Sequence, residues 1–272
     1  MTAFTVLGGS GFIGSHLLRQ LRSQGFSCSS PRRDENVLNR PLGHAVYCIG
    51  LTADFRGRPW DTARAHVCRL LEILEKGDFT SLLYLSTTRV YEGGESAMEE
   101  DPLYLHPSKP DALYNISKLM GESLCLSSGR ADVRIARLSN VYGGDFSTHS
   151  FLSYVVRDAV GQGKVILQSA TTSEKDYVHI NDVARLLPQI SLSGKHRIYN
   201  IASGVNTTNR ALMEVIQRVT GCAVEVADGA EWAVFPTICI DRIRDEFGFV
   251  PLRILDGLGD MIAEYRRKAG GP

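Results

Sequence analysis

Residues 8–14 read Gly8-Gly9-Ser10-Gly11-Phe12-Ile13-Gly14, between an apolar run at 4–7 and a helical pattern at 13–24. Glycines at this spacing allow a tight turn, a close approach of the backbone to a ligand and close packing of the next helix. The first turn of that helix would offer free N–H groups and a positive dipole end to a pyrophosphate. We therefore predict a dinucleotide-binding loop rather than a turn without a ligand. The predicted cofactor contacts in this loop are Gly8, Ser10, Gly11, Phe12, Ile13 and Gly14.

The first half of the chain alternates short apolar runs with longer helical patterns. Strand-like runs cover residues 4–7, 45–49, 82–86 and 133–138, and helical patterns cover 13–24, 60–75 and 112–127. Apolar strands that alternate with amphipathic helices indicate a parallel sheet covered on both faces. We predict the α/β class: a Rossmann-type doubly wound parallel sheet with a small C-terminal substrate lobe.

The second half is less regular. It carries helical patterns at 150–160, 209–219 and 255–267, and one strand-like run at 198–201. We expect residues 1–145, with 177–204 returning to them, to form the dinucleotide-binding domain. Residues 146–176 and 205–272 would form the small substrate-binding lobe.

Composition limits the classes of partner and compartment. The 272 residues include 30 Lys+Arg and 30 Asp+Glu, so no basic surplus suggests nucleic acid or an acidic membrane as a partner. No apolar run approaches the ~20 residues that span a bilayer, and the N-terminus does not read as a signal peptide. The six cysteines show neither Cys-x-x-Cys pairs nor zinc-ligand spacing, so we expect no metal, reduced thiols and a cytoplasmic protein.

The exit of the second predicted strand, residues 25–33, indicates which dinucleotide binds. NAD enzymes usually place an acid there to accept from the ribose 2′-OH. This chain has Arg32 and Arg33, which could pair with a 2′-phosphate and stack on adenine, so we predict NADP as the cofactor. Two solvated loop arginines are the alternative. If the strand ends one or two residues later, Asp34 would stand at the position of the acid and the predicted cofactor would be NAD.

Residues 114–118 read Tyr114-Asn115-Ile116-Ser117-Lys118 within a helical pattern. Residues four apart share a helix face, and a nearby ammonium should lower the pKa of a tyrosine from its reference value of about 10. Such a tyrosine can exchange a proton with a sugar oxygen near neutral pH. The strand at 82–86 runs into Thr87, whose hydroxyl would face the ligand crevice. We predict Tyr114, Lys118 and Thr87 as the catalytic residues, with a chance surface pair as the alternative.

These motifs, with four others, resemble the extended short-chain dehydrogenase/reductase family in its nucleotide-sugar epimerase/dehydratase branch. The resemblance covers nearly the whole chain. The other four motifs are Leu85-Ser86-Thr87-Thr88-Arg89-Val90-Tyr91, Arg137-Leu138-Ser139-Asn140-Val141-Tyr142-Gly143, Asp176-Tyr177-Val178-His179-Ile180-Asn181-Asp182-Val183-Ala184 and Tyr199-Asn200-Ile201-Ala202-Ser203-Gly204.

The resemblance implies roles for several further residues. Asn140 would contact substrate phosphates, unless it only caps a turn. Lys175 stands where relatives often carry an arginine for the nucleotide diphosphate, although an exposed loop lysine is the alternative. Thr88 is also expected at the substrate site. His66 stands near a position where relatives often have Asn, and we expect it to be structural. The resemblance further implies a homodimer formed through the helices around 60–75 and 112–127.

Departures from the family pattern guide the choice of reaction. Dehydratases resembling this chain carry an Asp-Glu pair where Thr88 and Arg89 stand, which argues against dehydration. Together with Arg32 and Arg33, this favours an NAD(P)-dependent oxidoreductase that acts on a nucleotide-linked sugar, as an NADPH-dependent keto-sugar reductase. The alternatives are a nucleotide-sugar epimerase with tightly bound NAD and a non-catalytic NADP-binding sensor.

Overall fold

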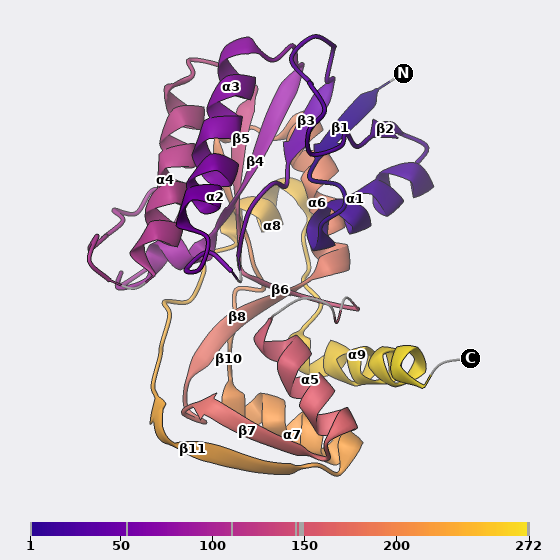
Figure 1. Ribbon diagram of the computed structural model, residues 1–272, viewed down its shortest axis with the longest axis vertical. Helices are drawn as coiled ribbons and strands as arrows, with labels where there is room; N and C mark the ends of the chain where they lie inside the picture. Colours follow the sequence, from indigo (N-terminus) through magenta and orange to yellow (C-terminus); the bar gives the residue numbers. More distant parts are fainter. Residues whose placement is uncertain (1, 53, 110, 145, 147–149, 271–272) are drawn as a thin grey trace.

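The computed structural model describes residues 2–52, 54–109, 111–144, 146 and 150–270. Its centre is a six-stranded parallel sheet in the order β2-β1-β3-β4-β5-β9 (Figure 1). The strands are β1 (Ala3–Leu7), β2 (Ser27–Ser29), β3 (His44–Tyr47), β4 (Ser81–Thr87), β5 (Val133–Leu138) and β9 (Ile198–Ile201). From β1 the chain adds β2 on one side and then crosses to β3 on the other side. Ligands bind at such a switch point, at the carboxyl ends of the strands. The predicted doubly wound parallel sheet is confirmed.

Helices cover both faces of this sheet (Figure 1). On one face lie α1 (Phe12–Ser23) and α6 (Ile180–Ser193), whose Leu17 and Leu186 are buried against the strands. On the other face lie α3 (Arg69–Lys76) and α4 (Ala112–Ser127), whose Leu70 and Cys125 are buried in a second cluster. The strands are apolar on both sides because both sides are covered.

The single helix predicted at 60–75 is wrong in its middle. The chain forms α2 (Pro59–Ala63), then a π-helical turn at Arg64–Cys68, then α3. A π-helical turn inserts an extra residue into the helical repeat and often marks a functional site. The fully buried His66 lies in this turn.

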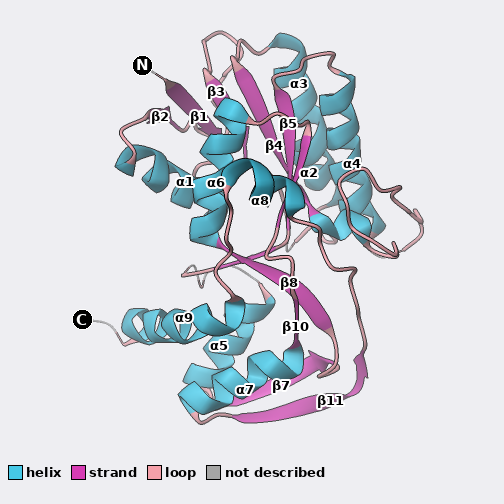
Figure 2. Cartoon of the chain, turned by 180° about the vertical axis from the view of Figure 1, so that it is seen from behind, coloured by secondary structure: helices cyan, strands magenta, loops and turns pink. Residues whose placement is uncertain are grey.

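The lower part of the molecule is the small lobe (Figures 1 and 2). Three helices, α5 (Phe151–Gly161), α7 (Asn209–Thr220) and α9 (Ile254–Ala269), pack around one apolar cluster that includes Leu152, Leu212 and Leu258. In the lobe β7 (Lys164–Ser169) pairs with β11 (Ala223–Glu231). Between lobe and large sheet, β8 (Glu174–His179) pairs with β6 (Asn140–Tyr142) and β10 (Asn206–Thr208).

These five strands were not predicted, because they are short or partly exposed and carry no continuous apolar run. Within the described residues, none of the helices combines the length and the apolar composition needed to cross a bilayer.

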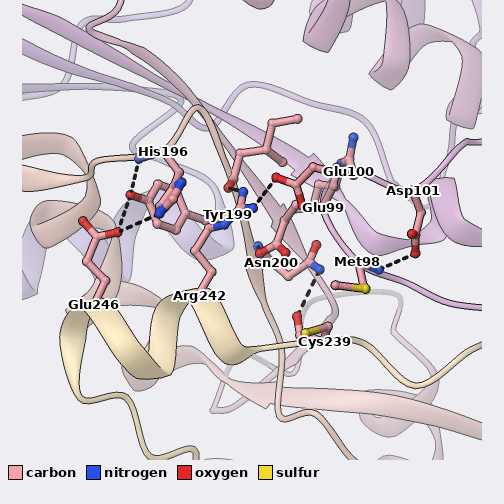
Figure 3. Close-up of polar contacts among 12 residues, drawn as sticks. Met98, Glu99, Glu100, Asp101, His196, Tyr199, Asn200, Cys239, Arg242 and Glu246 are labelled. Atoms are coloured by element: carbon pink, nitrogen blue, oxygen red, sulfur yellow. Dashed lines mark hydrogen bonds and ion pairs between the residues drawn. The ribbon is translucent and has the colours of Figure 1, made fainter.

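A further helix, α8 (Asp241–Phe247), was also not predicted, and it lies against β9 (Figure 3). The Tyr199 hydroxyl on β9 donates to Glu246 Oε2 at 2.8 Å, and Arg242 forms an ion pair with Glu100. Ile243 is fully buried in the core of the large sheet. This part of 205–272 therefore packs on the dinucleotide side of the molecule, while the proposed division into domains stays a prediction.

Candidate functional site

The predicted catalytic residues meet at the carboxyl end of the large sheet. Thr87 is the last residue of β4, and Tyr114 and Lys118 lie one turn apart near the start of α4. The Tyr114 hydroxyl is hydrogen-bonded to the side chains of Thr87 and Thr52. Thr52 lies in the loop after β3 and was not predicted, since a lone threonine in a loop gives no sequence signal.

The electrostatics of Tyr114 differ from the sequence expectation. Burial raises the pKa of Tyr114 above its ordinary value, and the Arg89 guanidinium and the two threonine hydroxyls oppose this only in part. The expectation that Lys118 lowers the pKa of Tyr114 is wrong, because loss of solvation outweighs the neighbouring charges. Tyr114 is therefore a protonated phenol at neutral pH.

Lys118 is buried, and its Nζ donates to the Leu85 carbonyl oxygen at 2.9 Å. Burial lowers the pKa of Lys118 to about 8, while the Glu122 carboxylate acts in the opposite direction. The ammonium is thus still the main form at neutral pH, but it gives up its proton far more readily than an exposed lysine.

His66 joins the loop after β3 to the helix that carries Tyr114. The Leu51 N–H donates to His66 Nε2 at 3.2 Å, so the proton of the neutral ring resides on Nδ1. This Nδ1–H donates to Ser117 Oγ at 2.8 Å, and Ser117 Oγ donates to the Tyr114 carbonyl oxygen at 3.0 Å. Burial and the nearby Lys118 ammonium lower the pKa of His66 to about 3, so the ring stays neutral.

The glycine loop has the shape that a dinucleotide needs. Gly8 adopts φ +89°, in the left-handed region that favours glycine. A Cβ at Gly14 would lie 2.3 Å from the Gly8 carbonyl oxygen, so the start of α1 can pack this closely only with glycine there. Ser10 and Gly11 are exposed at the tip of the loop, and no side chain among the described residues caps the N-terminus of α1. The free N–H groups of Phe12 and Ile13 could therefore bind a pyrophosphate.

The exit of β2 offers cations in place of an acid. Ser30 follows the strand directly, and its Oγ packs against Gly9. Arg32 and Arg33 are exposed, and within the described part of the chain neither guanidinium has an ion-pair partner. Glu35 is already engaged, because it forms an ion pair with Arg40 at 2.7 Å and accepts from the Arg32 N–H.

A cavity of about 240 Å³ lies between the large sheet and the lobe. The three residues predicted to bind substrate, Thr88, Asn140 and Lys175, all line it. They come from the turn after β4, from β6 and from β8, so only the tertiary fold unites them. Burial and the Arg89 charge lower the pKa of Lys175.

Arg89, Asp111 and Arg56 also line this cavity, and together they form an ion triad. Arg89 Nη2 contacts Asp111 Oδ2 at 2.5 Å, and Arg56 forms an ion pair with the other carboxylate oxygen. The Arg89 guanidinium also lies 5.2 Å from the centre of the Tyr114 ring. From the sequence, Arg89 was noted only as a departure from the dehydratase pattern. Arg56 and Asp111 were not predicted as site residues.

Comparisons with known proteins agree with this geometry. A sequence profile described as the NAD dependent epimerase/dehydratase family matches residues 42–202, which is more than half of the chain. The chain is similar to dTDP-glucose 4,6-dehydratase of Actinoplanes sp., with 22% identity over 96% of this chain and 97% of that protein. It is also similar to UDP-glucose 4-epimerase of Azospirillum brasilense, with 25% identity over 93% of this chain and 88% of that protein.

Among solved structures, MoeE5 in complex with UDP-glucuronic acid and NAD is similar in fold, with a TM-score of 0.84 and 23% identity over 98% of this chain and 99% of that chain. The profile match covers β3, β4, β5 and β9, together with Thr87, Tyr114 and Lys118. The chain therefore belongs to the NAD dependent epimerase/dehydratase family.

Proposed function

We propose that this protein is an NADPH-dependent reductase of a nucleotide-linked keto-sugar. The observation that carries the proposal is the contact between the Tyr114 hydroxyl and Thr87, with the buried Lys118 one helical turn away. This is the arrangement of a proton donor held beside a reacting oxygen. The neighbouring cavity, lined by Thr88, Asn140 and Lys175, would hold the sugar and its diphosphate.

In this mechanism NADPH, when bound at the glycine loop, supplies the hydride that the carbonyl carbon accepts. Tyr114 gives its phenolic proton to the carbonyl oxygen, so the ketone becomes an alcohol. The Thr87 hydroxyl orients that oxygen, and Lys118 would hold the nicotinamide ribose of the cofactor. The raised pKa of Tyr114 keeps the proton in place until the carbonyl accepts it.

Two features favour reduction over the other reactions of such a site. Tyr114 is protonated at neutral pH, which suits it to donate a proton to a carbonyl oxygen. Thr88 and Arg89 follow Thr87, so no carboxylate stands there to expel water. Arg32 and Arg33 support NADPH over NADH, because both are available for a 2′-phosphate.

An epimerase with tightly bound NAD is the second candidate, and the similarity to a UDP-glucose 4-epimerase favours it. The two are separated by denaturing the purified protein and identifying the released dinucleotide by mass spectrometry. A reductase should consume NADPH in proportion to product with UDP- or dTDP-linked keto-hexoses. If NAD co-purifies and UDP-glucose is turned over without added cofactor, the reductase proposal is wrong and the epimerase proposal takes its place.

The role of Tyr114 is tested by Tyr114→Phe, with Tyr154→Phe on α5 as the matched control. The first variant should lose about 10²- to 10⁴-fold in kcat, the range of general acid catalysis, and still bind NADPH. The control should keep its turnover. Near-normal turnover of Tyr114→Phe would refute the role of Tyr114, whereas a wild-type chain that binds NADPH without any turnover would be an NADP-binding sensor.

We also propose a homodimer through α2, α3 and α4. These helices expose Trp60, Leu71, Met120 and Leu126, which lie on the helices named by the family resemblance. Light scattering on the purified chain should give twice the mass of 29.9 kDa, and Met120→Glu should give the single mass. The cytoplasmic location stays a prediction from the cysteines.

A further inference from the structure

Arg89 occupies an unusual place in the site just described. It is the second residue after Thr87, and its guanidinium lies 5.2 Å from the centre of the Tyr114 ring. Its backbone N–H donates to Thr87 Oγ1 at 3.2 Å, which ties its position to the catalytic hydroxyl. A group bound by this guanidinium would therefore lie close to the reacting carbon of the sugar.

The Arg89 guanidinium is held in place by an ion pair and, within the described part of the chain, still has free hydrogen-bond donors. Asp111, at the N-terminus of α4, accepts Arg89 on one carboxylate oxygen and Arg56 on the other, so one carboxylate serves two cations. Within the described residues the side chain of Arg89 makes this one hydrogen bond, through Nη2. Nε and Nη1 have no partner among the described residues, and Nη2 carries a second hydrogen. The edge of the guanidinium that Asp111 does not use can therefore still bind a carboxylate through two parallel hydrogen bonds.

The cavity lining carries more cations than carboxylates, with Arg56, Arg89 and Lys175 against Asp111 and Asp176. The Asp176 carboxylate accepts three hydrogen bonds from Ser203 and the Val205 N–H, at 2.8 to 3.1 Å, which hold it in place. Lys175 adds another cation; it forms no ion pair with a described residue, and the Glu92 carboxylate only partly opposes the lowering of its pKa. The cavity is therefore suited to a ligand with an anionic group beside the sugar ring as well as its diphosphate.

We propose that Arg89 binds a carboxylate carried by the sugar, so that the substrate is a nucleotide-linked sugar acid rather than a neutral hexose. The inference rests on the proposed function, because it takes the ligand to be a nucleotide-linked sugar. A diphosphate is the other anion that could meet Arg89. The sugar carboxylate is favoured because Arg89 borders Tyr114, whereas Lys175 and Asn140 lie on the strands β8 and β6, which join the sheet to the lobe.

The test compares UDP-glucuronate, UDP-glucose and UDP, with dTDP-glucose and dTDP beside them, by calorimetric titration of the full chain. The wild-type protein should bind UDP-glucuronate more tightly than UDP-glucose. Arg89→Gln should remove about 10-fold or more of the affinity for UDP-glucuronate, as expected for a hydrogen-bonded charge pair, and leave UDP-glucose and UDP nearly unchanged. The matched control is Arg58→Gln, which removes an exposed arginine paired with Asp61 outside the cavity. It should leave the affinities for UDP-glucuronate, UDP-glucose and UDP unchanged.

The outcomes separate the two proposals. An equal loss for UDP, UDP-glucose and UDP-glucuronate would assign Arg89 to the diphosphate and overturn the carboxylate. Equal affinities for the glucose and glucuronate compounds in both proteins would overturn it too, while leaving the nucleotide-sugar function in place. Failure of the chain to bind any UDP or dTDP compound would remove the proposed function itself, and this inference with it.

Discussion

Replacing His66 by Asn tests the buried ring that connects the loop after β3 to the helix of Tyr114. In the folded protein the pKa of His66 falls from 6.5 to about 3, because the ring is buried and Lys118 is near. In the unfolded chain the same ring takes up a proton below about 6.5. Between these two values the unfolded state binds the extra proton, so the free energy of unfolding falls as the pH falls through this window.

The size of the effect follows from the two pKa values. At about 1.4 kcal/mol per pKa unit, the gap between 6.5 and about 3 corresponds to about 5 kcal/mol in full. Roughly 3 kcal/mol of this is lost between about pH 7 and about pH 4. Protonation would also break the acceptor contact of Nε2 with the Leu51 N–H, next to Thr52.

The assay is urea unfolding of the wild type and His66→Asn at about pH 7 and about pH 4. The wild type should lose roughly 3 kcal/mol more than the variant on acidification. His196→Asn, at an exposed histidine, is the control and should follow the wild type. Parallel pH curves for the wild type and His66→Asn would refute the reasoning.

Three further substitutions test other parts of the site. Lys118→Met removes an ammonium whose pKa of about 8 lies below the ordinary 10.5, so below about pH 8 the variant should gain up to about 3 kcal/mol in urea unfolding while turnover collapses. That gain should shrink as the pH rises from about 8 to 10.5, and a constant gain would contradict it. Thr52→Val removes a hydrogen bond to Tyr114 and should lower kcat about 10-fold in steady-state assays without changing the Kd for NADPH; an unchanged kcat would remove Thr52 from the site. Gly14→Ala forces a Cβ against the Gly8 carbonyl oxygen and should lower stability by about 1–3 kcal/mol and weaken dinucleotide binding, measured by thermal shift with and without NADPH; normal binding would contradict the tight loop.

Long elements with a strong period were predictable from local sequence. The strand Val133–Leu138 and the helix Ala112–Ser127 match their predicted bounds, because burial on a parallel sheet demands apolar runs of that kind. The π-helical turn at Arg64–Cys68 was missed, since its side-chain pattern is nearly that of an ordinary helix. The short strand β6 (Asn140–Tyr142) was missed because its pairing with β8 depends on a distant segment.

The sequence by itself determined the parallel sheet, the dinucleotide loop and the Tyr114–Lys118 pair. Each of these is encoded within a few neighbouring residues, by glycine at a tight turn or by two side chains one helical turn apart. Only the tertiary structure decided that burial keeps Tyr114 protonated, that Thr52 reaches its hydroxyl, and that Arg56 and Arg89 share Asp111. Solvation and charge at a point depend on every segment packed around it, and those segments are brought together by the fold rather than by their order in the chain.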